Sequence, residues 1–232
     1  MGKQELSVTL ISQIEKAVRQ NFIPGLILWC IGIILVFCFY FLDASRPWFQ
    51  LVIEWKEQYG FLYSGFSTAL FGGVIPYLFL RFSGRGGFGP NWIHGVIFIS
   101  YWALRGVDVD AFYRFQAWLF GSGNQWQTIF KKVLFDQFVY CVFWATPITA
   151  LFYEWKDSKF SFSVPISHDW LVALKDKIII FMVSTWMVWI PATAIVYSLP
   201  SPLQIPLFNL TLCFYVLLVS LFEKSNSSGT LN

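Results

Sequence analysis

Residues Ile178–Phe222 read IIIFMVSTWMVWIPATAIVYSLPSPLQIPLFNLTLCFYVLLVSLF and contain no Asp, Glu, Lys or Arg. A helix needs roughly 20 apolar residues to cross the hydrocarbon core of a bilayer, so this run is long enough for two helices. Its midpoint, YSLPSPLQIP, holds three prolines. Proline removes a backbone donor and disfavours helix in the residue before it. The run therefore predicts two membrane-spanning helices joined by a turn at these prolines.

The composition of the whole chain indicates the same class of protein. Of its 232 residues, 56% are hydrophobic and 12% are charged, whereas soluble domains carry roughly 25% charged residues. The chain also holds 12 Trp and 10 Tyr, the side chains that settle at membrane–water interfaces. We therefore expect an integral membrane protein, in a bacterial inner membrane or an organelle membrane.

Charge-free runs also mark the other spans. Asn21–Leu42 and Gln58–Leu80 are each long enough for one span. Spans are expected at about 23–42, 60–81, 131–153, 177–199 and 203–222. A sixth, 92–105, is uncertain because only about fourteen residues there are apolar enough for lipid. The excess of Lys and Arg in alternate loops favours six spans, with both termini on the cytoplasmic side.

The segments outside the spans predict two more helices. Residues 1–20 have the pattern of an amphipathic helix, which we expect to lie on the bilayer surface. Residues 106–121 predict an interfacial helix that begins at Asp108 or Asp110. Residues 223–232 form a polar tail. The predicted fold is all-α, with one membrane domain over residues 21–222 that holds five to six helical segments, plus these two helices.

The sequence gives little support for metal, cofactor or nucleic-acid sites. The four cysteines lie in apolar runs, far from both histidines, so no metal site is expected. A GxGxxG match at 84–89 follows a membrane-type run and not a strand, so no cofactor is expected there. A turn in which Arg81 and Arg85 touch lipid phosphates is the favoured interpretation. The net charge of +3, with scattered Lys and Arg, fits lipid headgroups better than nucleic acid.

Polar residues interrupt an apolar run in Lys131–Pro147, KKVLFDQFVYCVFWATP. Lys131 and Lys132 are expected at the membrane interface. Asp136 lies about one turn from Lys132 and can pair with it there. Alternatively, Asp136 and Gln137 enter the hydrocarbon, where an ionisable residue faces a bundle interior or a water-filled cavity. The sequence leaves both interpretations open.

A bend is expected after these residues. Pro147 removes the backbone hydrogen bond to Phe143, which favours a kink. Thr146 and Thr149 share a helix face that lies about 80° to 140° from Asp136. A kink or a neighbouring helix is therefore needed to join these polar groups into one path.

The last two spans carry the remaining candidates. Trp186 and Trp189 begin an aromatic stripe, which is most often packing, and we expect both indoles near the interface. Pro191 breaks the hydrogen-bond ladder of the same helix. Gln204 is a further polar candidate, and Pro206 is a further bend.

These motifs resemble those of a known family. KKVLFDQ followed by Pro147, WIP at Trp189–Pro191, SPLQIP at Ser201–Pro206 and GGVIP at Gly72–Pro76 are similar to elements of the Mpv-seventeen/PMP-twenty-two family. The chain resembles a divergent, bacterial-type member in which Pro206 replaces the family's Arg. The resemblance implies a compact bundle of membrane helices with a proposed role as a pore for small solutes.

Three functions follow as hypotheses. The first is a pore or conduit for small solutes, with Asp136 and Gln137 as a polar constriction and the prolines as bends. The second is a non-conducting membrane protein that organises or binds partners and uses the same pair to join helices. The least favoured is a lipid-acting enzyme that uses His94, because no pair of nucleophile and base is evident and we expect no enzyme. Expected partners are the bilayer, small solutes and a second copy of the chain.

Overall fold

The computed structural model describes residues 3–84, 91–161 and 167–228, and every regular element in these ranges is helical. The predicted all-α class is confirmed. In chain order the elements are α1 (Lys3–Phe41), the 3-10 turn η1 (Asp43–Ser45), α2 (Arg46–Tyr59), α3 (Phe61–Thr68), the π-helical η2 (Ala69–Val74), α4 (Ile75–Phe82), α5 (Trp92–Phe120), α6 (Trp126–Phe135), the π-helical η3 (Asp136–Ala145), α7 (Thr146–Asp157), α8 (His168–Tyr197) and α9 (Ser201–Ser228).

Five helical stretches are long and apolar enough to cross a membrane. They are Ile11–Phe41, Phe61–Phe82, Trp126–Asp157, His168–Tyr197 and Ser201–Leu218. By the same criteria of length and hydropathy, α5 is not a candidate span. This helix contains residues 92–105, the uncertain sixth span predicted from the sequence. The chain is therefore a helical membrane protein with five candidate spans in the described residues.

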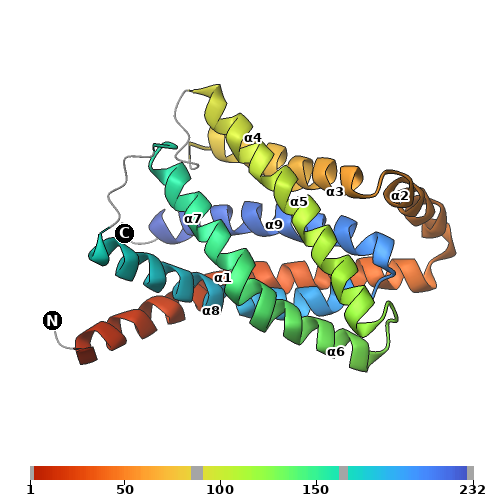
Figure 1. The fold of residues 1–232 in the computed structure, drawn as a ribbon, viewed down its shortest axis with the longest axis horizontal. Coiled ribbons are helices and arrows are strands. Elements are labelled where there is room, and N and C mark those ends of the chain that lie inside the picture. The colour runs from red at the N-terminus through yellow and green to blue at the C-terminus, as the bar shows by residue number, and fades with distance from the viewer. Residues whose placement is uncertain (1–2, 85–90, 162–166, 229–232) are drawn as a thin grey trace.

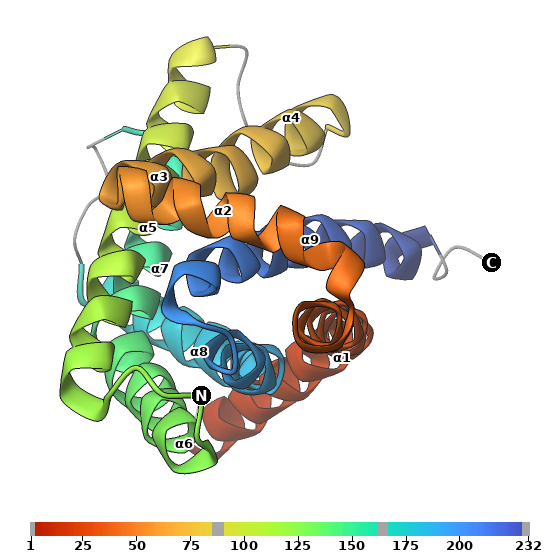
Figure 2. The same ribbon diagram turned by 90° about the vertical axis from the view of Figure 1, so that its right-hand side faces the viewer.

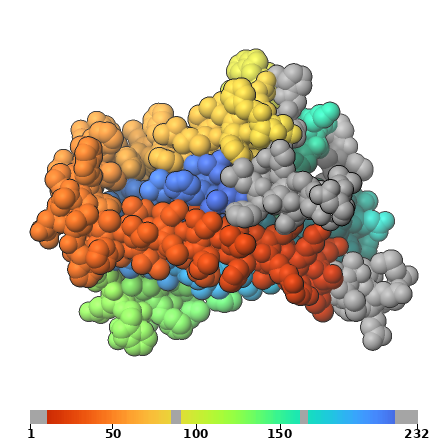
Figure 3. Space-filling model, turned by 180° about the vertical axis from the view of Figure 1, so that it is seen from behind, coloured from red at the N-terminus to blue at the C-terminus, as the bar shows by residue number. Residues whose placement is uncertain are grey.

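The helices form a bundle in which segments distant in sequence pack side by side (Figure 1). α1 lies along α8 and also contacts α9, and α5 packs against α3, η2 and α9. Seen end-on, α8 and α9 lie between α1 on one side and α5 on the other (Figure 2). From behind, α1 runs along the middle of the face, with α9 beside it (Figure 3). α2 crosses one end of the bundle and leads into α3.

α5 is one helix, where the sequence predicts an uncertain span over 92–105 and a separate interfacial helix from Gly106. Gly106 is not a break but a contact point, because a Cβ there would lie 2.3 Å from the backbone oxygen of Ser64 in α3. At Gly73 in η2, a Cβ would lie 3.1 Å from Cα of Ile99 in α5. Small residues let two membrane helices approach closely. Glycine here serves packing, and the helix continues through it.

α1 also differs from the prediction of a separate amphipathic helix over residues 1–20. It continues through Asn21 to Phe41, with Pro24 inside it. Asn21 lies inside this helix, and its side-chain oxygen accepts a hydrogen bond from Tyr215 Oη in α9 at 3.2 Å. The residue that separates the polar and apolar halves of α1 therefore binds a neighbouring helix.

Two spans contain wide helical turns just ahead of a proline. η2 precedes Pro76, and η3 precedes Pro147. Proline lacks the N–H that an α-helix needs, and its ring clashes with the carbonyl four residues back. A π-helical turn, with i→i+5 bonds, accommodates that mismatch and occurs frequently at functional sites. The bend expected at Pro147 takes the form of this wide segment, and α7 begins at Thr146.

Candidate functional site

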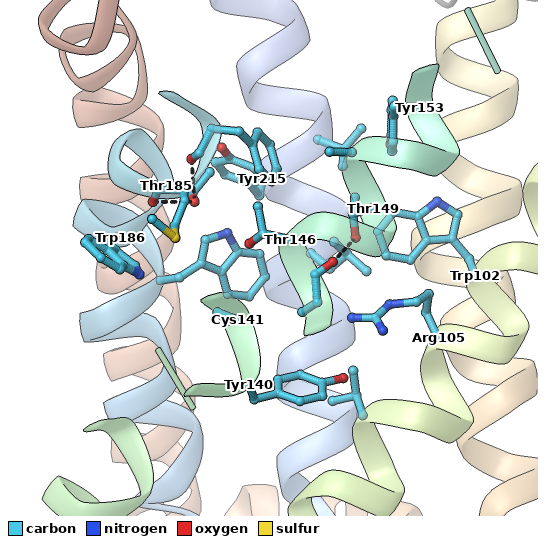
Figure 4. A pocket seen from close by; sticks show the side chains of 18 of the residues that line it. Trp102, Arg105, Tyr140, Cys141, Thr146, Thr149, Tyr153, Thr185, Trp186 and Tyr215 are labelled. Carbon is cyan, nitrogen blue, oxygen red and sulfur yellow. Dashed lines mark hydrogen bonds between the residues drawn. The ribbon is translucent and has the colours of Figure 1, made fainter. Parts of the chain in front are cut away.

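A cavity of about 510 Å³ lies inside the bundle, between α5, the continuous helix α6–η3–α7, α8 and α9. Figure 4 shows side chains from these helices around the central space. Pockets for small molecules have volumes of roughly 300–1,000 Å³, so the cavity is large enough for a small organic ligand. Ten aromatic side chains contribute to its wall: Phe98, Trp102, Tyr113, Tyr140, Tyr153, Phe181, Trp186, Trp189, Phe208 and Tyr215.

Asp136 lies in the wall of this cavity and is 4% exposed. Tyr197 Oη donates a hydrogen bond to Oδ2 of Asp136. Gln137 Nε2 donates to Oδ1 at 3.1 Å, and Cys141 Sγ donates to the same oxygen at 3.4 Å. In the described residues Asp136 has no ion pair with Lys132. The sequence left open whether Asp136 pairs with Lys132 or faces the bundle interior. In the structure the carboxylate faces the interior.

Lys132 is buried inside the bundle, and its place at the depth of the membrane interface stays a prediction. Its side chain is 1% exposed, and Nζ lies 5.7 Å from the centroid of the Tyr197 ring. The negative face of an aromatic ring attracts a cation, and the apolar stem of lysine packs well in a core. Lys131 is exposed, as expected for an interfacial residue.

Trp186 and Trp189 lie in the cavity wall, and their place near the membrane interface stays a prediction. Trp186 Nε1 donates a hydrogen bond to the backbone oxygen of Gln137 at 3.1 Å (Figure 4 labels Trp186). Gln137 belongs to the π-helical η3, where the altered ladder makes its carbonyl available to a neighbouring helix. This bond ties α8 to η3 beside Asp136.

The two threonines predicted as polar candidates also reach the cavity. Thr146 and Thr149 line it together with Asp136, so the polar groups on either side of Pro147 face one space. Thr149 Oγ1 donates to the backbone oxygen of Ala145 at 2.7 Å and accepts from Tyr101 Oη at 2.9 Å. The threonine thereby links α7 to α5.

An ion pair in α5 forms part of the wall and was not singled out from the sequence. Arg105, which is 8% exposed, pairs with Asp108. Asp108 also accepts from Tyr140 Oη at 2.8 Å and from Trp144 Nε1 at 3.1 Å. The signal in the sequence was a pair of opposite charges three residues apart, directly after the apolar run that ends at Leu104.

Charged residues at the end of α7 mark where the cavity opens. Glu154 and Lys177 both line the cavity and form an ion pair across α7 and α8. The side chain of Lys177 is 62% exposed, so the cavity reaches the surface there. Lys156, also in the wall, pairs with Asp157 at 2.8 Å.

A packed layer of core residues adjoins Asp136. Beyond Asp136 lies a core cluster that joins the α8–α9 turn to α5 and α6, and its buried members are Val109, Tyr113, Val133, Val196, Tyr197, Leu199, Leu203, Ile205 and Leu207. Tyr113 and Tyr197 form an edge contact with ring centroids 5.1 Å apart. Only Val109 and Tyr113 of this cluster line the cavity. The cavity therefore borders this packed layer at Val109 and Tyr113, and Asp136 is bonded to Tyr197 within the layer.

Other predicted site residues lie away from the cavity. Gln204 is buried in the first turn of α9, and its Nε2 donates to the backbone oxygen of Leu199 at 3.1 Å. Pro191 and Pro206 lie inside α8 and α9 without ending either helix. Arg81 lies at the end of α4, where Nη1 donates to Tyr77 Oη at 3.1 Å.

Arg85 lies outside the described residues. His94, the candidate for a lipid-acting enzyme, packs on the ring of Phe160 at 5.1 Å between centroids and does not line the cavity.

A second buried polar cluster lies where α2, α3 and α5 meet, and sequence reasoning missed most of it. Lys56 Nζ donates to Asp110 Oδ2 at 2.5 Å, to Ser64 Oγ at 2.8 Å and to the backbone oxygen of Gly60 at 3.1 Å. Arg114 Nε pairs with Asp110 Oδ1 at 3.2 Å, four residues away on the same helix. Burial lowers the pKa of Lys56, and the hydrogen bond and charge of Asp110 oppose that shift.

Comparison with family models, with curated proteins and with solved structures finds no match for this chain. Within the described ranges, no group of three or more His, Cys, Asp or Glu residues is arranged to hold a metal ion. The site must therefore be interpreted from its own chemistry.

Proposed function

We propose that this membrane protein is a conduit for small solutes and that its path runs through the cavity beside Asp136. The observation that carries the proposal is a cavity of about 510 Å³ inside the bundle, with a buried carboxylate in its wall. Ionisable residues inside membrane spans typically face solute or ion pathways. The sequence resemblance to the Mpv-seventeen/PMP-twenty-two family points in the same direction.

In this proposal, the packed layer beyond Asp136 is the gate. The layer consists of the Tyr113–Tyr197 contact and the apolar residues behind it. Passage requires that α8 or the η3 segment move away from this layer. Irregular helical backbone in membrane proteins is tolerated where it is buried in protein or lines a cavity, and η3 satisfies this condition.

The test is conductance of the purified protein in planar bilayers across a salt gradient. We expect discrete openings whose reversal potential changes in Asp136→Asn, because the variant removes this charge from the cavity wall. Asp43→Asn is the matched control, since Asp43 is exposed and pairs with Arg46 outside the cavity. Silence from folded, inserted protein would contradict the conduit.

The alternative is a non-conducting protein that organises membrane helices or binds a partner, including a second copy of the chain. The hydrogen bonds of Asp136 to Tyr197 and of Trp186 to the Gln137 carbonyl favour it, because they join η3 to α8. Such bonds average about 0.6 kcal/mol in membrane proteins. Cross-linked partners without any flux would support this alternative.

A further inference from the structure

Every charged side chain in the cavity wall has an ionic partner except Asp136. The cations of the wall and their acidic partners are Arg105 with Asp108, Lys156 with Asp157, and Lys177 with Glu154. Lys132 does not line the cavity, and its Nζ lies over the ring of Tyr197. Across the described part of the chain, Asp136 is bonded only by neutral donors. Its charge is the one that a ligand in the cavity can neutralise.

Aromatic rings extend from this carboxylate along the wall. Tyr113 contacts Phe208 with centroids 6.3 Å apart, Phe208 contacts Trp189 at 5.7 Å, and Trp189 contacts Tyr215 at 5.8 Å. All four rings line the cavity. Ring faces attract a cation within about 6 Å of the centroid, and most strongly where water is excluded. An aromatic surface that leads to a carboxylate is complementary to a cation with an apolar body.

From this geometry we infer that the cavity binds a monovalent organic cation, whose ammonium group lies between Asp136 and the aromatic wall. An inorganic cation fits less well, because a hydrated ion gains little from an apolar wall. An anion also fits less well, because Asp136 would repel it and the cations of the wall are already paired with acidic residues. The inference rests on the proposed function, since the bound cation is the solute that the conduit would carry, but binding requires no opening of the gate.

The test uses the full-length protein in detergent micelles and follows tryptophan fluorescence, since Trp102, Trp186 and Trp189 line the cavity. Benzyltrimethylammonium is compared with benzylsulfonate, which has the same phenyl group and a tetrahedral head of opposite charge. We expect a saturable change with the ammonium compound and none with the sulfonate over the same concentrations.

Two variants test where the cation lies. Asp136→Asn is expected to raise the dissociation constant about 30-fold or more, because a buried charge pair loses one partner. Trp189→Leu is expected to raise it about threefold through loss of one cation–π contact. The exposed Asp43→Asn variant should bind like wild type. The Trp189 variant and the comparison of the two ions remain informative if Asp136→Asn fails to fold.

Three results would overturn the inference: no saturable response to the ammonium compound, equal binding of both ions, or an unchanged dissociation constant in folded Asp136→Asn. The inference and the proposed function can fail separately. Binding at Asp136 without any flux would retain the cation site and reject the conduit. Flux without binding of the ammonium compound would retain the conduit and reject the cation site.

Discussion

Asp110 and Asp136 are both buried carboxylates, but the two regions neutralise them differently. Asp110 has two cationic partners, Lys56 and Arg114, near the point where α3 and α5 approach closely at Gly106. Among the residues that the structure describes, Asp136 has only neutral donors, and it faces a cavity. A charge that the protein compensates in full holds helices together, whereas one left uncompensated beside open space is available to a ligand. The first region is therefore structural, and the second is the candidate site.

The largest expected effect comes from breaking the compensated pair. Asp110→Leu leaves Lys56 buried without its carboxylate and should lower the free energy of unfolding by about 3–5 kcal/mol. Asp136→Asn should cost less, about 1–3 kcal/mol, because it disturbs neutral donors only. Unfolding in detergent by denaturant measures both variants.

The double variant Lys56→Met/Asp110→Leu is the control for this first prediction. Removing both members of a buried ion pair is often close to neutral, so most of the stability should return. Equal losses in Asp110→Leu and Asp136→Asn would break the distinction between the two regions.

The next prediction compares the packing at the crossing of α3 and α5 with the packing around the cavity. Gly106→Ala should destabilise by about 2 kcal/mol, because its Cβ would lie 2.3 Å from the Ser64 oxygen and must push α3 away from α5. Ala150→Leu, whose added atoms can enter the cavity, should change stability by less than about 0.5 kcal/mol. Gly123→Ala is the matched control, since no atom lies within 4 Å of a Cβ built there. A Gly106→Ala protein as stable as the control would contradict the close crossing.

A smaller effect is expected beside Asp136. Tyr197→Phe removes the hydroxyl that donates to Asp136 and should cost about 1.5 kcal/mol. Tyr101→Phe, which loses a neutral hydrogen bond to Thr149, should cost about 0.5–1 kcal/mol. Thermal unfolding in detergent measures both variants. The Tyr197 variant should lose more stability than the Tyr101 variant, because the Tyr197 hydroxyl is bonded to the carboxylate of Asp136.

The smallest effect is expected at an exposed pair. Arg19 and Glu15 lie 2.8 Å apart, but their side chains are 78% and 60% exposed. Arg19→Ala should therefore change the free energy of unfolding by less than about 0.5 kcal/mol. A loss comparable to that of Asp110→Leu would show that burial does not decide the value of an ion pair in this protein.

The sequence was sufficient for the membrane class and for Asp136, because both depend on local pattern. A run without charges identifies a span wherever it occurs, and a carboxylate inside such a run attracts attention by itself. The partner of Asp136 was out of reach, since Tyr197 lies 61 residues away in sequence. The pairing of Lys56 with Asp110, 54 residues apart, was hidden for the same reason.

Contacts between distant segments also explain where the sequence predictions stop. Glycine often marks the end of a helix, and the sequence predicted a boundary at Gly106. Its actual role is to let α3 approach α5, and only the folded structure brings α3 near. The sequence marked Trp186 and Trp189 as interfacial residues, but it could not reveal that both line a cavity formed by other helices. It also placed Lys132 at the membrane interface, and it could not reveal the ring of Tyr197, which lies 5.7 Å from Nζ and attracts its charge.

The wide helical segment η3 has a consequence for the evolution of this gene. Each π-helical turn holds one residue more than the α-helical turn it replaces, and such turns occur mostly as single-turn bulges. Deleting one codon between Asp136 and Ala145 would restore a regular ladder without changing the rest of the span. The residues after the deletion would then keep nearly the same face of the helix, because the wide segment absorbs its extra residue locally. A single-codon event is therefore enough to remove the wide turn that carries Asp136 and Gln137, while Thr146 and Thr149 stay on their present side of the helix.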